Sequence, residues 1–130
     1  MRKRMLWSIV TTSALLTLAN AQMNHQEQGD AGDLPETAQA TGTDTSTQLA
    51  AIRGTLGASD VDMYVIYIAD PANFVATTVN NNTNFDTQLW LFDSEGKGVA
   101  FNDDVGGDTP GRSRIDNSSE LLTNRSAGIY

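Results

Sequence analysis

The chain has 130 residues and no cysteine, with 16 acidic residues against 8 basic ones and a formal net charge of −8. This balance argues against nucleic acids and anionic membranes as partners, because both are bound through positively charged surfaces. Without cysteine the protein has no disulfide to stabilise it, and cations are the natural counterpart of so many carboxylates.

The N-terminal residues predict a secretory signal peptide. Positions 2–4 are basic, residues 5–18 are apolar apart from Ser and Thr, and Ala21 closes a small-x-small cleavage site. We expect residues 1–21 to be removed on export, so that the mature chain begins at Gln22; an uncleaved N-terminal anchor is the alternative. No second apolar segment of spanning length follows. The protein is therefore expected to be secreted or at the cell surface, with no membrane span after cleavage.

Cleavage would leave 109 residues, which is the size of one domain. Three of the eight basic residues leave with the signal peptide, so the mature chain keeps 5 basic and 16 acidic residues and a net charge of −11. We divide the chain into a signal peptide (1–21), a polar linker or arm (22–46) and a single β-rich domain (47–130).

The arm is rich in Gln, Thr, Gly and Asp and has neither a helical nor a strand period, which is typical of a linker. Within it, Asp30 and Asp33 precede Leu34 and a proline. Leu34 could pack against the domain while the two aspartates face a shared ion. A solvated linker is the alternative that composition leaves open.

From residue 47 onward, short apolar and β-branched runs separated by turn residues predict a series of strands. The strongest run is Val61–Ala69, in which Tyr64, Ile66 and Ile68 share one face. Gly54, inside the first run, indicates a bulge or a close approach. The expected strands cover residues 48–56, 61–69, 73–79, 89–92 and 99–101.

Residues 84–104 predict a β-hairpin that ends in an acidic loop. Leu89 and Leu91 point to one face and Trp90 and Phe92 to the other, because side chains alternate along a strand. A run of turn residues, Asp-Ser-Glu-Gly, then separates this strand from the next apolar alternation. One face of the hairpin must be less buried if the sheet has a solvent side.

No segment after the signal peptide predicts an amphipathic helix. Short strands at intervals of roughly ten residues, divided by turn residues, favour a β-sandwich. The expected fold class is therefore all-β, an antiparallel β-sandwich of jelly-roll type. Ile129 and Tyr130 resemble the opening of a further strand, so we expect a C-terminally truncated sequence that lacks its last strand.

Several stretches carry a resemblance to a known family. Residues 52–56 (IRGTL) and 60–64 (DVDMY) form an opening of the type I-x-G-x-L … D-x-D-x-Y. Residues 86–93 (DTQLWLFD), with a later Gly and NDD, form a central hairpin, and residues 121–130 end in AGIY, as before a final strand. In order and spacing these stretches resemble the bacterial pre-peptidase C-terminal domain family, small β-sandwiches appended to many secreted bacterial enzymes and surface proteins. The resemblance covers residues 30–130.

This resemblance implies a jelly-roll-like fold, no catalytic activity of its own, and a role as a secreted accessory or adhesion module. It also implies calcium as a cofactor, because related domains of secreted collagenases bind calcium through an acidic N-terminal arm and bind matrix protein. Carried over by position, the calcium candidates are Asp30, Asp33, Asp60 and Asp62, with solvated carboxylates beside turns as the alternative. An extracellular polymer or matrix protein is the expected partner.

Two further groups of residues have open interpretations. Asn102, Asp103 and Asp104 form, with Asp108, a second acidic loop that is either a metal site or a set of local turn hydrogen bonds. The second group consists of the strand aromatics Tyr64, Tyr67, Trp90 and Phe92. They either fill the core or line a surface that binds carbohydrate or peptide. A carbohydrate-binding module that uses surface aromatics is therefore the alternative function.

Residue patterns typical of catalysis are scarce. His25 is the only histidine and lies in the arm, and no cysteine is present as a nucleophile. Ser113, Ser118 and Ser119 have no base nearby in the sequence, and no Gly-x-Ser-x-Gly motif occurs. Paired carboxylates would allow a glycosidase, but a sandwich of this size seldom forms the necessary cleft. We therefore expect no enzymatic activity.

Overall fold

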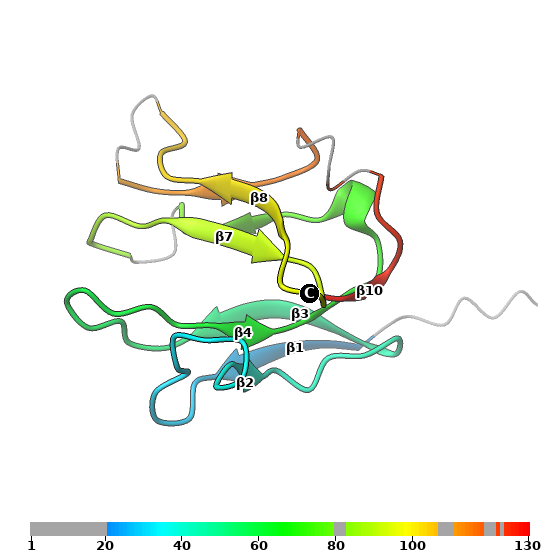
Figure 1. Cartoon of the computed structure of the whole chain (residues 1–130), viewed down its shortest axis with the longest axis horizontal. Coiled ribbons are helices and arrows are strands. Elements are labelled where there is room, and N and C mark those ends of the chain that lie inside the picture. Colours follow the sequence, from blue (N-terminus) through cyan, green and yellow to red (C-terminus); the bar gives the residue numbers. More distant parts are fainter. Residues whose placement is uncertain (1–20, 80–82, 107–110, 119–121, 123) are drawn as a thin grey trace, which may run out of the picture.

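Strands dominate the computed structural model of the chain, which describes residues 21–79, 83–106, 111–118, 122 and 124–130 (Figure 1). Within these residues the strands are β1 (Ala21–Gln26), β2 (Gln39–Ala40), β3 (Thr47–Arg53), β4 (Tyr64–Val65), β5 (Tyr67–Ile68), β6 (Ala76–Thr77), β7 (Leu89–Phe92), β8 (Gly98–Asn102), β9 (Arg114–Ile115) and β10 (Gly128–Ile129). A short 3-10 helix, η1, covers Pro71–Asn73. The predicted all-β class is confirmed.

The expected signal peptide falls outside the described residues, apart from Ala21 at the start of β1. In the part of the chain that the structure describes, no helical segment has the length and hydropathy of a membrane span.

In the described residues the strands associate in pairs rather than in one continuous ladder. β1 pairs with β3 and β2 with β4 in parallel, whereas β5–β10, β6–β9 and β7–β8 are antiparallel. Figure 1 shows β7 and β8 on one side of the molecule and β1, β3 and β4 on the other.

The core is a small cluster of buried apolar side chains from distant parts of the chain. Its members are Ile68 in β5, Leu91 in β7, Val99 in β8, Ile115 in β9, and Leu122. Partly buried side chains pack against this cluster: Ile66, Phe74, Leu89, Ala100 and Tyr130. Burial of these side chains requires β5, β7, β8 and β9 to meet, so the hydrophobic effect couples the separate strand pairs.

The predicted hairpin is confirmed as β7 and β8. Its turn is closed by Gly96, whose N–H donates to the Asp93 carbonyl oxygen at 2.8 Å and whose φ of 77° suits glycine. The backbone N–H of Lys97 and the guanidinium of Arg125 both donate to the Asp93 carboxylate, at 2.9 and 2.7 Å. These bonds lower the pKa of Asp93 and tie the turn to the C-terminal segment.

A β-bulge interrupts the pairing of the hairpin. Leu91 is opposite Ala100 and Phe92 is opposite Gly98, which leaves Val99 as an extra residue on β8. A bulge places two consecutive side chains toward the same side of a strand. Val99 is therefore buried in the core next to Ala100.

The expectation that residues 22–46 contain no strand is wrong. β1 runs parallel to β3 from Ala21, opposite Thr47, to Gln26, opposite Arg53, and β2 pairs with β4. The physical reason is that backbone N–H and C=O groups pair without help from side chains when a strand edge is available. A polar strand at the edge of a sheet needs no hydrophobic period, so the sequence pattern gave no sign of it.

The expected single strand Val61–Ala69 is wrong in one respect, because it is divided into β4 and β5. Ile66, between them, exchanges two backbone hydrogen bonds of 2.9 Å with Tyr130, while β4 pairs with β2 and β5 with β10. The segment therefore changes its pairing partner midway. The strand expected at 73–79 is likewise shorter, because η1 occupies its beginning and only β6 remains.

Candidate metal site

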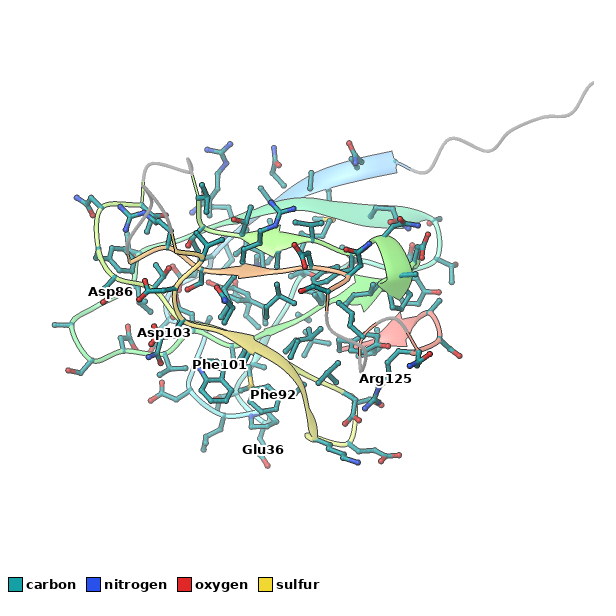
Figure 2. The ribbon with its side chains drawn as sticks, turned by 90° about the horizontal axis from the view of Figure 1, so that it is seen from above. Glu36, Asp86, Phe92, Phe101, Asp103 and Arg125 are labelled. Carbon is teal, nitrogen blue, oxygen red and sulfur yellow. The ribbon has the colours of Figure 1, made fainter. Side chains whose placement is uncertain are left out.

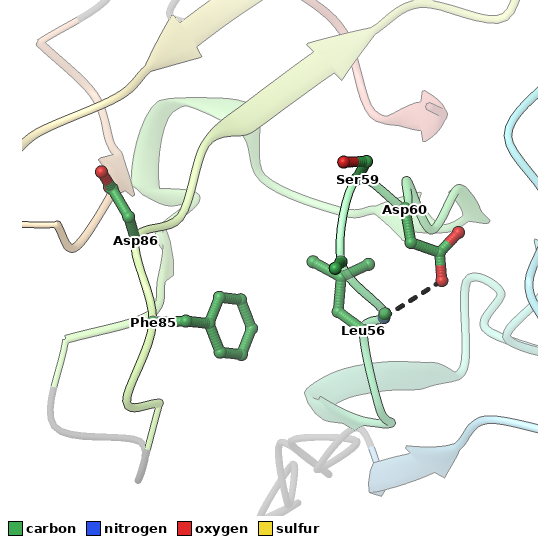
Figure 3. Close-up of a pocket in the computed structure, with 7 residues that line it drawn as sticks. Leu56, Ser59, Asp60, Phe85 and Asp86 are labelled. Carbon is green, nitrogen blue, oxygen red and sulfur yellow. Dashed lines mark hydrogen bonds between the residues drawn. The ribbon is translucent and has the colours of Figure 1, made fainter.

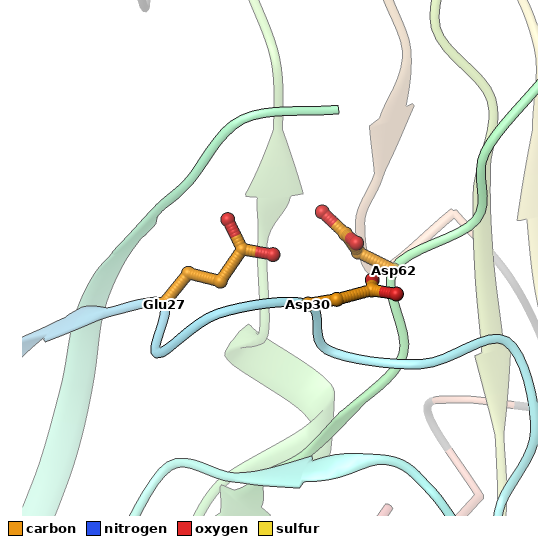
Figure 4. A group of neighbouring side chains, drawn as sticks. All are labelled: Glu27, Asp30 and Asp62. Atoms are coloured by element: carbon orange, nitrogen blue, oxygen red, sulfur yellow. The ribbon is translucent and has the colours of Figure 1, made fainter. Parts of the chain in front are cut away.

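Three carboxylates from two separate segments converge beside the end of β1. They belong to Glu27, Asp30 and Asp62, together called the acidic triad (Figure 4). One carboxylate oxygen of each residue lies within 4.8 Å of those of the other two. Glu27 directly follows β1, Asp30 lies in the loop after it, and Asp62 precedes β4. The pairing of the arm with β3 and β4 is what brings them together.

Backbone contacts with the end of β3 fix Glu27. Its N–H donates to the carbonyl oxygen of Arg53 at 2.9 Å, and its Oε2 accepts the Thr55 N–H at 2.8 Å. Gly54 between them makes this approach possible, because a Cβ there would lie 2.3 Å from Glu27 Oε2. Of the two interpretations of Gly54, a bulge or a close approach, the structure shows a close approach, made by the side chain of Glu27.

We expect Gly54→Ala to disturb the acidic triad, because the added methyl group would push Glu27 away from the Thr55 N–H. Loss of such a buried hydrogen bond costs about 1–3 kcal/mol of unfolding free energy, which urea denaturation would measure. Gly98→Ala is the matched control, since no atom lies within 4 Å of its added carbon. Equal losses in the two variants would contradict this account.

The loop that carries Asp30 is held beside Asp62 by the backbone. Met63, next to Asp62, donates its N–H to the Gly32 carbonyl oxygen at 3.0 Å. Asp30 Oδ1 accepts a long hydrogen bond of 3.4 Å from the Gly32 N–H. The hydroxyl of Tyr64 lies 3.5 Å from Asp62 Oδ2. These contacts position two of the carboxylates while leaving most of their lone pairs free.

The electrostatics of the triad are unfavourable without a positive partner. Glu27 is 9% exposed, and its Oε1 and the Oδ1 of Asp62 are buried without a hydrogen-bond partner among the described residues. Burial raises the pKa of Asp62, and the charges of Glu27, Asp60 and Asp30 raise it further. Burial, followed by the charges of Asp62 and Glu27, also raises the pKa of Tyr64 well above its usual range.

This donor set fits a hard divalent cation. Calcium binds six to eight oxygens at about 2.3–2.6 Å, so two of its ligand atoms can lie up to about 5 Å apart. The 4.8 Å limit within the triad meets that condition. Glu27, Asp30 and Asp62 would hold the ion, and backbone oxygens and water commonly supply the remaining ligands.

The four sequence-predicted ligands do not all belong to this group. The structure brings Asp30 and Asp62 together, whereas Asp33 and Asp60 lie outside the triad. Asp60 instead closes a turn, in which Oδ2 accepts the Gly57 N–H at 3.2 Å and Oδ1 accepts the Val61 N–H at 3.0 Å. Asp33 is exposed.

Sequence reasoning missed Glu27, which turns out to be the most buried member of the triad. It lies in a polar segment with no motif around it, and only the pairing of β1 with β3 moves it next to Asp62. The nearest sequence signal was Gly54, whose predicted close approach did not say which residue would approach.

The second acidic loop uses two of its side chains to hold the segment that leads into β9. Asn102 Oδ1 accepts the Arg114 N–H at 2.7 Å, and Asp104 Oδ1 accepts the Gly111 N–H at 2.7 Å. The first bond joins the end of β8 to the first residue of β9, and the second joins the loop after β8 to the segment before β9, so both link separate segments rather than closing a single turn. Asp108 lies outside the described residues.

A cleft of about 480 Å³ lies between the turn at residues 56–60 and the segment before β7 (Figure 3). Phe85 points across it toward Leu56, whereas the carboxylates of Asp60 and Asp86 point away from the gap between these two side chains. The cleft is therefore apolar at its centre, and its two carboxylates do not face each other as a glycosidase pair would.

The residues with nucleophile or base chemistry have structural partners. The His25 ring lies with Nε2 2.8 Å from Gln39 Oε1 and its centroid 5.8 Å from that of Tyr64, edge to face. Ser113 is fully buried, and its hydroxyl lies between the carbonyl oxygens of Thr87 and Asp103. Both side chains stabilise the packing of neighbouring segments.

Comparison of the chain with protein-family models, curated proteins and solved structures gave no match. The resemblance to pre-peptidase C-terminal domains therefore rests on the motifs quoted above. The acidic triad is argued from its own geometry.

Proposed function

We propose that this protein is an exported, non-catalytic β-sandwich module with an accessory or adhesive role, stabilised by calcium at the acidic triad. The observation that carries the proposal is the buried Oε1 of Glu27, which has no hydrogen-bond partner in the part of the chain that the structure describes and belongs to a group of three converging carboxylates. A buried carboxylate oxygen without a partner is costly unless it is neutralised or bound to a metal.

Calcium would fasten the N-terminal arm to the domain. Glu27 and Asp30 belong to the arm, whereas Asp62 belongs to the segment that leads into β4. A cation between them would replace mutual repulsion by attraction and would add to the hydrogen bonds that already hold the arm. For an exported protein without a disulfide, an ion is the available cross-link.

The accessory role is supported by the contacts of the side chains that catalysis would use, because these side chains already have structural partners. His25 and Ser113 are engaged in packing contacts, and the one cleft described above is apolar at its centre. The resemblance to pre-peptidase C-terminal domains points the same way. This strongly acidic domain would bind an extracellular polymer or a matrix protein as its partner.

A melting series tests the calcium part. At a calcium concentration a hundredfold above Kd, binding to the folded state adds about 2.7 kcal/mol, which raises the melting temperature of a small domain by about 10–20 °C. We expect this rise over a sample in EDTA, and a smaller rise with magnesium, which requires a tighter octahedral site.

Two variants locate the effect. Glu27→Gln should abolish the rise, whereas Asp33→Asn, which removes an exposed arm carboxylate outside the triad, should retain it. A wild-type chain that melts at the same temperature in calcium and in EDTA would overturn the proposed calcium site.

A further inference from the structure

Three aromatic side chains gather on the outward side of the β7–β8 hairpin. They are Trp90, Phe92 and Phe101, together called the aromatic face. Trp90 is 57% exposed and Phe101 49% exposed. The ring centroids of Trp90 and Phe101 are 4.0 Å apart, and the rings of Trp90 and Phe92 are parallel to within 8° at 6.4 Å. The side chains form one continuous apolar surface.

Strand alternation explains why these positions face outward but not why they are aromatic. Leu91, between Trp90 and Phe92, is buried in the core, so its neighbours must lie on the opposite side. Polar or β-branched residues would serve a solvent-facing strand position equally well. Exposed aromatic area of this kind is instead typical of a surface that binds something.

Polar groups and open space border the aromatic face along the hairpin. Figure 2 shows Phe92, Phe101 and Asp103 along the same side, with Asp103 beyond Phe101. Gln88 is exposed and, two residues before Trp90, lies on the same side of the chain. At the other end Gly98 is opposite Phe92, and no atom lies within 4 Å of the space where a Cβ would be.

We propose that the aromatic face binds a neutral polysaccharide, with a sugar ring stacked on Trp90 and Phe101 and its hydroxyls bonded to Gln88 and Asp103. The C–H face of a sugar ring packs on a flat aromatic surface, and the amide and carboxylate supply both donors and acceptors for hydroxyl groups. This inference rests on the proposed accessory role and names the chemistry of its partner.

Area and charge favour this occupant over a second copy of the chain. An aromatic side chain buries about 150–250 Å² when fully covered. Trp90 and Phe101, which are about half exposed, and the less exposed Phe92 therefore offer at most a few hundred Å², below the roughly 800 Å² per partner of a standard protein interface. The net charge of −8 also opposes self-association and binding of anionic polysaccharides. A neutral chain of a few sugar rings matches the size of the surface and meets no repulsion.

The test uses the full chain in calcium buffer, with pull-down on cellulose and chitin and affinity electrophoresis in xyloglucan, galactomannan and laminarin. We expect saturable binding to at least one of these neutral polysaccharides. Trp90→Ala should weaken it by about tenfold or more, since the largest stacking surface is lost. Val75→Ala, which truncates an exposed apolar side chain outside the hairpin, should leave binding unchanged.

Three results would overturn the proposal: no binding to any of the five polysaccharides, binding that survives Trp90→Ala, or a Trp90-dependent dimer in place of polysaccharide binding. Circular dichroism and melting of each variant distinguish lost binding from lost folding. The calcium-dependent rise in melting temperature is measured on the same samples, because Trp90→Ala leaves the acidic triad intact. Failure of polysaccharide binding with that rise present would therefore leave the calcium proposal standing.

Discussion

Leu91→Ala is expected to lower the free energy of unfolding by about 2–5 kcal/mol, the usual cost of removing a buried leucine side chain. Leu91 is 7% exposed and belongs to a core with few members, so the surrounding side chains cannot readily refill the space. The whole free energy of unfolding of a small domain is about 5–15 kcal/mol, so this loss would be a large part of it. Urea denaturation at 25 °C, with the denaturant slope compared between variants, would measure the loss.

The neighbouring residue provides the control. Trp90→Ala removes a larger side chain, but one that lies mostly in solvent, and should cost about 1 kcal/mol or less through its contacts with Phe101. The contrast between adjacent positions depends only on which way each side chain points. If Trp90→Ala were as damaging as Leu91→Ala, the assignment of inner and outer faces to β7 would be wrong.

Asp62→Asn should change stability in opposite directions with and without calcium. In EDTA the substitution removes a carboxylate that burial and the charges of Glu27, Asp60 and Asp30 disfavour, so the variant should melt higher than the wild type. In calcium it removes a ligand, so most of the expected rise of about 10–20 °C should disappear. A calcium melting series on both proteins would show curves that cross.

The raised pKa of Asp62 also predicts how the stability of the wild type and of Asp62→Asn should depend on pH. The folded state holds this proton more tightly than the unfolded state, whose pKa is near the ordinary value of 3.8. In EDTA, wild-type stability from this group is therefore present below that value and is lost as the pH rises through the raised folded pKa. The stability of Asp62→Asn in EDTA should lack this pH-dependent contribution.

Asp93 contributes to pH dependence with the opposite sign. The Lys97 N–H and the Arg125 guanidinium lower its pKa, so its contribution is present at neutral pH and is lost as the pH falls below about 3.8. This contribution of Asp93 is the same in the wild type and in Asp62→Asn, so it cancels when the stabilities of the two proteins are subtracted.

One outcome would contradict the account of Asp62. If Asp62→Asn were destabilising in EDTA as well as in calcium, Asp62 would be a hydrogen-bonding residue rather than one of three repelling carboxylates.

Local signals in the sequence were sufficient for the first strand and the turn of the hairpin, but not for the bulge that places Val99 inside and Phe101 outside. Alternation of Leu89 to Phe92 sets the two faces, and a turn sequence ending in glycine sets the reversal. Both depend on residues close in the chain, where steric rules and side-chain direction act directly. The close approach at Gly54, which directly follows β3, was predictable for a related reason, since a glycine in an apolar run leaves room for another atom.

Features that depend on distant partners were not predictable. β1 has a polar sequence and exists because β3 offers it a parallel edge, and the division of Val61–Ala69 reflects which segments lie beside it. The acidic triad follows the same rule. Asp30 and Asp62 were identified as candidates by residue type, but Glu27 joins them only through the pairing of the arm, which no local pattern indicates.

The bulge at Val99 makes the spacing of β8 more important than its composition. By adding one residue opposite β7, it shifts the phase of the strand, so that Val99 fills the interior and Phe101 still lies opposite Trp90 outside. Deleting Val99 would restore regular alternation, with Ala100 still inside and Phe101 still outside, but the core would lose a buried side chain. An extra residue elsewhere in β8, where no bulge absorbs it, would exchange the two faces of the strand beyond it. The hairpin therefore accommodates one extra residue at the bulge and nowhere else along β8.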